Sequence, residues 1–257
     1  MNSHALAVLE YPRVLAVVAE RATSSLGARR LRALVPSTDR AWLEGEHRRV
    51  AATRALVASD GGWSPEPVPD LTDPLGRLRV LGTVWTAPEP LGAATLLRSS
   101  RRTRDALTDP KRPAVVSAVL APLSSRLVSA KRIEETIERT IAEDGTVRDD
   151  ASPKLRQIRR DLRASQGELV SLLERLMGRL ESHQQVSDAS VTVRNGRYVI
   201  PVRANARGAV GGIVHDTSST GATLFVEPPA AVEFGNRIRE LEAEELREID
   251  RILRELT

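Results

Sequence analysis

Arginines and hydroxyl-bearing residues gather in one stretch of the sequence, between residues 191 and 228. The candidate phosphate-binding residues in it are Arg194, Arg197, Arg203, Arg207, Ser218, Ser219 and Thr220. Arginine forms bidentate, charge-assisted hydrogen bonds to phosphate, and hydroxyl and backbone N–H groups commonly complete such contacts. These residue types therefore predict a contact with a nucleic-acid backbone. The alternative to a nucleic-acid contact is that the arginines pair with carboxylates of the same chain and the segment is a solvated hairpin.

The same stretch predicts its own fold. Apolar and polar residues alternate on both sides of Asn195-Gly196, a dipeptide that tolerates the positive φ angles of a two-residue hairpin turn. The resulting hairpin has three cross-strand pairs: Arg194 with Arg197, Val193 with Tyr198, and Val191 with Ile200. Like charges directly opposed across a ladder repel, and a bound polyanion would relieve that repulsion.

No set of residues makes a strong catalytic or metal-binding case. The run GAVGG at 208–212 lacks the Gly-Lys-Ser/Thr ending of a phosphate loop, so we expect no nucleotide site here. His215 and Asp216 precede Ser218, but closeness in sequence does not place a base against a nucleophile. One His-Asp pair also supplies too few ligands for a metal. We expect the pair to end a strand before a polar turn at 217–221, and a hydrolase using it is the minor alternative.

Two long helical segments flank the hairpin and must position it. In the first, Ser152 is the expected N-cap and Pro153 the first helical residue. Its apolar residues have coiled-coil spacing: Leu155, Ile158, Leu162, Leu169, Leu172 and Leu176. The second helix begins at Pro228-Pro229 and has a similar stripe: Phe234, Ile238, Leu241, Ile249, Ile252 and Leu256. Since neither helix could bury so narrow a stripe alone, we expect them to pair antiparallel.

The rest of the sequence predicts a mainly α fold. Helical periodicity dominates residues 1–123, apart from a loop at 60–70 that is too rich in glycine and proline for regular structure. The predicted domains are a helical core (1–123), an outgoing lever arm (124–186), a small antiparallel β clamp at the tip (187–228) and a returning lever helix (229–257). Because the last helix keeps its register to Thr257, we expect the protein to continue beyond it.

Composition narrows the class of function. Cysteine is absent, which excludes disulfides and thiolate metal sites and is typical of a reducing cytoplasm. The N-terminus has no signal-peptide pattern and no stretch is long enough to span a bilayer, so we expect a cytoplasmic protein without a membrane partner. The formal net charge of +4 permits nucleic-acid binding without requiring it. Aromatic residues make up only 3% of the chain, which argues against a base-stacking platform.

The chain closely resembles the second bacterial branch of the MutS family, the paralogue that lacks mismatch-reading domains. The resemblance is strongest around the hairpin, in EDGTVRDDASPKLRQIRRDLR (143–163) and RNGRYVIPVRANARGAVGGIVHDTSSTGATLFVEP (194–228). It extends to the last helix, ELEAEELREIDRILRELT (240–257), and to LEYPRVLAVVAERATSSLGARRL (9–31) and LVPSTD (34–39) near the N-terminus. It therefore covers nearly the whole sequence.

The resemblance implies a helical core and two lever helices that end in a small clamp, followed by an ATPase domain and an Smr nuclease module outside these residues. The longer protein would be a homodimeric ABC-type ATPase and endonuclease that uses ATP and Mg²⁺, while these 257 residues would hold no catalytic group, cofactor or metal. Two roles follow: suppressing recombination by binding and cutting branched DNA, and splitting collided ribosomes, through rRNA, for rescue. The alternative is a dimerisation or protein-interaction module, with nucleic acid bound by the absent domains.

Overall fold

The computed structural model describes residues 3–58 and 63–257. The chain divides into two compact units. The first runs to Arg148 and includes Leu253–Thr257, and the second comprises Asp149–Ile252. Helices predominate in both, and the second also has a small antiparallel sheet, so a mainly α fold with a small antiparallel sheet is confirmed, while the long coiled-coil lever arms stay a prediction. The predicted domain boundaries at 123, 186 and 228 stay predictions.

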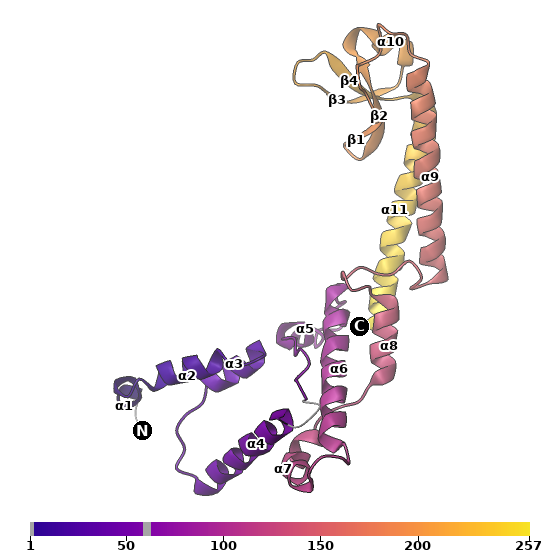
Figure 1. Ribbon diagram of the computed structural model, residues 1–257. Helices are drawn as coiled ribbons and strands as arrows, with labels where there is room; N and C mark the ends of the chain where they lie inside the picture. Colours follow the sequence, from indigo (N-terminus) through magenta and orange to yellow (C-terminus); the bar gives the residue numbers. More distant parts are fainter. Residues whose placement is uncertain (1–2, 59–62) are drawn as a thin grey trace. The chain divides into compact units, whose positions relative to one another are not determined.

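The first unit contains eight helices within the described residues (Figure 1). They are α1 (Ser3–Val8), α2 (Tyr11–Ala19), α3 (Ser25–Arg32), α4 (Arg40–Ala58), α5 (Thr72–Arg77), α6 (Pro88–Thr108), α7 (Ala114–Ser124) and α8 (Lys131–Thr140). Of the predicted irregular loop, residues 60–62 lie outside the described ranges, and 63–70 have neither helix nor strand.

An apolar cluster and an ion pair hold the larger helices of this unit together. The cluster is formed by α4, α6 and α7 and consists of Ala52, Leu56, Leu107, Val116 and Leu120. On the other side of α6, Arg101 donates from Nε and Nη2 to the carboxylate of Glu134 on α8, which is 3% exposed. A bidentate pair of this kind fixes both partners more firmly than a point charge would.

The second unit contains a sheet and two long helices. Its elements are α9 (Pro153–Gly178), β1 (Thr192–Arg194), β2 (Arg197–Arg203), the 3₁₀ turn η1 (Ala204–Ala206), α10 (Arg207–Val210), β3 (Ile213–Thr217), β4 (Thr223–Glu227) and α11 (Pro229–Leu256). Helix α9 begins as expected, because Ser152 Oγ accepts a hydrogen bond from Leu155 N at 2.9 Å and Pro153 is the first helical residue.

The four strands form one antiparallel sheet in the order β1-β2-β4-β3. Asn195 and Gly196 have φ angles of 50° and 71°, as a two-residue hairpin turn requires. The predicted pairs Arg194 with Arg197 and Val193 with Tyr198 are confirmed. The ladder of β1 ends with Thr192 opposite Val199, so the third predicted pair, Val191 with Ile200, lies beyond it.

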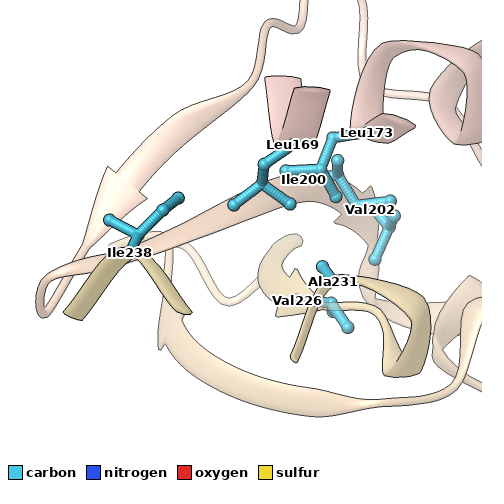
Figure 2. Packing of buried hydrophobic residues seen from close by; sticks show 7 residues of the cluster. All are labelled: Leu169, Leu173, Ile200, Val202, Val226, Ala231 and Ile238. Atoms are coloured by element: carbon cyan, nitrogen blue, oxygen red, sulfur yellow. The ribbon is translucent and has the colours of Figure 1, made fainter. Parts of the chain in front are cut away.

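One side of the sheet packs on both long helices. The cluster draws on α9, on β2 and β4, and on α11 (Figure 2), and its buried members are Leu169, Leu173, Ile200, Val202, Val226, Ala231 and Ile238. All seven are at most 3% exposed. Each buried aliphatic side chain contributes on the order of 1.5–3 kcal/mol, so this cluster fixes the sheet against the ends of α9 and α11.

Side-chain contacts between α9 and α11 run in opposite order along the two helices. Ser152 Oγ lies 2.8 Å from Glu248 Oε1, and Arg159 Nε lies 2.7 Å from Glu245 Oε1. Further along, Leu169 joins the same apolar cluster as Ile238. The helices are therefore antiparallel, as expected.

The stripes themselves differ from the prediction at one position in each helix. Leu173 is fully buried, whereas Leu172 is only partly so. In α11 the predicted stripe has no member between Leu241 and Ile249, yet Glu248 is 2% exposed there. It accepts from Ser152 and pairs with Lys154 at 3.6 Å and Arg251 at 2.6 Å. The spacing of apolar residues could not predict this buried carboxylate, because its partners come from both helices.

None of the helices in the described ranges combines the length and the apolar character that crossing a bilayer would require. Nor do the described residues contain a group of three or more acidic, histidine or cysteine side chains placed to hold a metal ion.

Candidate nucleic-acid interface

The predicted phosphate-binding residues separate into two places on the sheet. Arg197 begins β2 and Arg203 ends it, which sets them about 20 Å apart at the usual strand rise. In Figure 1 the β1–β2 turn and α10 lie at opposite ends of the sheet. The Asn195 turn therefore does not share an end of the sheet with Arg203 and α10.

Arg194 and Arg197 lie in what we call the paired cluster, together with His215, Asp216 and Glu227. Arg194 Nε lies 3.3 Å from Asp216 Oδ2, and its guanidinium is 4.6 Å from the centre of the Phe225 ring. Arg197 Nη1 lies 3.3 Å from Glu227 Oε1 and donates to Asn236 Oδ1 at 3.0 Å. The repulsion expected between the two arginines is thus offset within the chain, as the alternative interpretation of the hairpin proposed.

Glu227 is the centre of the paired cluster. It is 2% exposed, and its second oxygen, Oε2, lies 2.7 Å from His215 Nε2. Both carboxylate oxygens therefore have partners, as a buried charge needs. Close packing from α11 shields the contact: a Cβ at Gly235 would lie 2.9 Å from Arg197 Nη1 and 3.0 Å from Glu227 Oε1.

The β1–β2 turn is also bound to its surroundings. Asn195 Nδ2 donates to the backbone oxygen of His215 at 2.8 Å, and Arg239 Nη2 donates to the backbone oxygen of Asn195 at 3.2 Å. These bonds connect the turn to β3 and to α11. The turn is thus held in place within the second unit, although Arg194, Asn195 and Gly196 remain exposed.

Of the remaining predicted residues, Arg203 lies beside the turn that holds Ser218, Ser219 and Thr220, and Arg207 follows on α10. We call these five residues the open end. Arg203 is paired with Thr223 across β2 and β4, and Ala204 N donates to Ala222 O at 2.9 Å. These bonds place the end of β2 beside the turn between β3 and β4. Arg207 follows four residues after Arg203, at the first residue of α10.

The cations of the open end have no carboxylate partner among the described residues. Arg203 is exposed and uses one N–H group, Nε, to donate to Gln185 O at 2.8 Å, which leaves four of its five donors. Arg207 is exposed and makes no ion pair in the described part of the chain. Such guanidinium groups can accept a phosphate without first breaking an internal pair.

The hydroxyl groups of the open end differ in their contacts. Ser218 Oγ accepts from Thr223 N at 3.0 Å and so closes the turn. Ser219 and Thr220 are exposed at its tip, and Gly221 takes a φ of 71°. Ser218 thus shapes the turn, while Ser219 and Thr220 offer hydroxyls toward a ligand.

The arrangement does not bring together the groups of a hydrolase. His215 lies against Glu227, Asp216 lies against Arg194, and the Ser218 hydroxyl bonds within its own turn. A nucleophile needs its base within hydrogen-bond reach, and the contacts of these three side chains are to other groups. The prediction of a polar turn at 217–221 is correct in outline, although His215 lies within β3 and Thr217 is its last residue.

Sequence reasoning missed Glu227, Asn236 and Arg239 as parts of this region. Glu227 and Asn236 lie 30 and 39 residues from Arg197, and Arg239 lies 44 residues from Asn195. One signal was present: Glu227 follows the apolar run of β4 directly, and an acid at the end of a buried strand needs a cation nearby.

The fold and the open end define a class: a mainly helical chain whose small antiparallel sheet presents unpaired arginines. Comparison with known proteins then gives the family. The chain is 64% identical over 257 residues to the protein named Endonuclease MutS2 of Gemmatimonas aurantiaca, of which it covers 31%. It is 38% identical over 263 residues to Endonuclease MutS2 of Geobacillus thermodenitrificans and 34% identical over 257 residues to that of Acetivibrio thermocellus, covering 33% and 32% of them.

These matches include the whole of this chain and correspond to the N-terminal part of the relatives. The chain spans about a third of the length of the curated relatives it matches. No family model matches it. The chain belongs to the MutS family, in the branch of the Endonuclease MutS2 proteins.

Proposed function

We propose that this chain is the N-terminal, nucleic-acid-engaging part of a MutS-like ATPase, and that the open end contacts a phosphate backbone. The observation that carries the proposal is a pair of exposed guanidinium groups without a carboxylate partner among the described residues: Arg203, beside a hydroxyl-bearing turn, and Arg207, at the start of α10. Backbone contacts of this kind position a nucleic acid without reading its sequence. They suit a target defined by shape, such as branched DNA or rRNA on a collided ribosome.

In this proposal α9 and α11 are the lever arms. The contacts of buried Glu248 with Ser152 and Lys154, and the cluster of Leu169, Leu173 and Ile238, join the two helices at separate places along their length. A pair joined in this way can move as a rigid body. It would pass motion driven by ATP and Mg²⁺ in the longer protein to the sheet.

The hydrolytic roles are assigned to residues outside these 257. The relatives are named endonucleases, and the longer protein would cut branched DNA to suppress recombination, split collided ribosomes, or both. It would act as a homodimer in the cytoplasm, while this part contributes binding and no catalytic group.

The test is binding of the 257-residue chain to a labelled four-way DNA junction and to a structured rRNA fragment, measured by fluorescence anisotropy between 50 and 200 mM salt. Arg203→Glu with Arg207→Glu should weaken binding by about ten-fold or more and reduce the salt slope by about 2. The matched control is Arg156→Glu with Arg175→Glu, the same charge change on α9. Equal losses in both double variants would mean that net charge alone governs binding, and unchanged affinity in the first would remove the open end from the contact.

A second candidate function is a dimerisation or protein-interaction module. It is favoured by the exposed apolar side of α2, where Val14, Val17 and Val18 are 54%, 55% and 44% exposed at helical spacing. Sedimentation of the chain with and without the junction separates the two. A stable dimer that does not bind the junction would favour this candidate.

A further inference from the structure

A groove runs along α4 in the first unit. Two hollows of about 740 and 540 Å³ adjoin there. They share Thr53, Leu123 and Arg126 among their lining residues, and we call the two adjoining hollows the groove. Neither the open end nor the paired cluster contributes to it.

The floor of the groove is apolar. Val50 and Val57 on α4 are 58% and 51% exposed and lie seven residues apart, hence on the same side of the helix. Leu123 from α7 is 41% exposed beside them. The second hollow reaches the buried cluster of this unit at Leu56, Leu107 and Leu120, with Trp63 and Leu127 partly exposed beside them. A contiguous apolar surface of this kind, edged by polar groups, marks an interaction site.

The rim of the groove is cationic. Arg30 from α3, Arg54 from α4 and Arg126 after α7 line it, and all three are exposed. They make no ion pair within the described residues, whereas the fourth arginine, Arg49, is paired with Glu46. The rim therefore favours carboxylates over ammonium groups.

The length of the groove fits a helix. Its α4 lining extends from Glu46 to Ala58, about 18 Å at the helical rise, or just over three turns. An amphipathic helix placed along such a groove inserts apolar residues at i, i+4 and i+7 and keeps its flanks at the rim. The acidic helix of this chain, α11, already packs Ile238 and Ala231 against α9 and the sheet.

We propose that this groove binds an amphipathic helix with an apolar stripe flanked by glutamate or aspartate, supplied from outside these 257 residues. The apolar floor receives the stripe, and the three unpaired arginines meet the acidic flanks. The proposal concerns the first unit only, so its test is independent of whether the open end binds nucleic acid.

The probe is a pair of helix-stabilised peptides of about 18 residues, long enough to exceed the groove. Both carry leucine at i, i+4 and i+7. One has glutamate at the flanking positions and the other has lysine, and a scrambled glutamate peptide controls for composition. Titrated into the 257-residue chain by calorimetry, the glutamate peptide should bind about ten-fold more tightly than the lysine peptide, with an affinity that falls as salt rises.

The variant Arg54→Glu with Arg126→Glu should reverse that preference. The matched control, Arg104→Glu with Arg132→Glu, makes the same change at exposed arginines of the first unit outside the groove lining, and should preserve it. Val57→Asp should weaken both peptides, and circular dichroism verifies that each variant is folded. Three outcomes overturn the proposal: equal binding of both charged peptides, a preference that Arg54→Glu with Arg126→Glu leaves unchanged, or self-association of the chain that Val57→Asp abolishes.

Discussion

The paired cluster and the open end belong to the same four-stranded sheet and use the same residue type, yet their arginines have different surroundings. Arg197 is 17% exposed and lies against Glu227, Asn236 and the close approach of Gly235. Arg203 and Arg207 are exposed, and Arg203 donates to the backbone oxygen of Gln185. The two groups of arginines differ in the carboxylates near them. Strands β3 and β4 contribute Asp216 and Glu227 to the paired cluster, whereas the turn between them contributes serine and threonine to the open end.

The contrast teaches that a local count of arginines does not locate a binding surface. An arginine that binds phosphate must first lose any internal partner, and breaking a buried pair leaves an uncompensated charge. Arg197 is therefore a positioning residue, which fixes the sheet on α11. Within the described residues, the arginines of the open end have no such partner to lose.

The largest effect should come from the centre of the paired cluster. Glu227→Gln removes the charge that offsets Arg197 and contacts His215, and should lower the free energy of unfolding by about 4 kcal/mol. Urea denaturation of the chain measures it. The control is Glu240→Gln, an exposed carboxylate in α11, which should change stability by less than about 0.5 kcal/mol. A loss at Glu227 as small as that at Glu240 would mean that the cluster is not buried in solution.

The second effect tests whether another buried carboxylate behaves like Glu227. Hydrogen bonding from Arg251, aided by Ser152 and Lys154, lowers the pKa of Glu248 from its usual 4.5 to about 2. A depressed pKa in the folded state contributes stability that is fully present above pH 4.5 and lost as the pH falls through about 2. The shift corresponds to about 3 kcal/mol.

The free energy of unfolding, measured from pH 6 to pH 2, should show this loss in the unchanged chain. In Glu248→Gln it should depend less steeply on pH. Glu242→Gln, on an exposed position of the same helix, controls for the general effect of one carboxylate. If the two variants have the same pH profile, the network around Glu248 does not stabilise the α9–α11 contact.

The third effect concerns the packing that encloses the paired cluster. Alanine normally stabilises a helix interior by about 1 kcal/mol relative to glycine. At Gly235 the added Cβ would meet Arg197 Nη1 at 2.9 Å and Glu227 Oε1 at 3.0 Å, so we expect a net loss of about 1–2 kcal/mol. At Gly167 in α9 nothing lies within 4 Å, and the same change should stabilise the chain. Thermal unfolding of the two variants should shift in opposite directions, and a shared direction would contradict the close contact at Gly235.

Local signals predicted much of the second unit. The Asn195-Gly196 hairpin, the Ser152 cap with Pro153, and the mainly helical class all follow from neighbouring residues, and all are present. What the sequence could not supply were contacts between distant residues. Glu227, which neutralises Arg197 from 30 residues away, and Glu248, which occupies a buried position among apolar residues, both depend on how the chain folds back.

The same limit explains why the candidate site was predicted as one cluster. Arg194, Arg197, Arg203 and Arg207 are close in sequence, but an extended strand separates its two ends by about 20 Å. Residues that are close along one strand can therefore be far apart in space. The turn at 218–222, by contrast, is distant from Arg203 in the sequence and is brought beside it by the pairing of β2 with β4.

The smallest effect should distinguish the two groups of arginines at the surface. Arg194 is 43% exposed, pairs with Asp216 and lies over Phe225, so Arg194→Ala should cost about 0.5–1 kcal/mol of stability. Arg207→Ala should cost less than about 0.5 kcal/mol, because no internal pair is lost. Junction affinity should show the opposite order, with a loss of about three-fold or more for Arg207→Ala and little change for Arg194→Ala. If Arg194→Ala instead weakens binding more than Arg207→Ala, the internal pair of Arg194 opens on contact with nucleic acid, and the paired cluster must be counted as part of the interface.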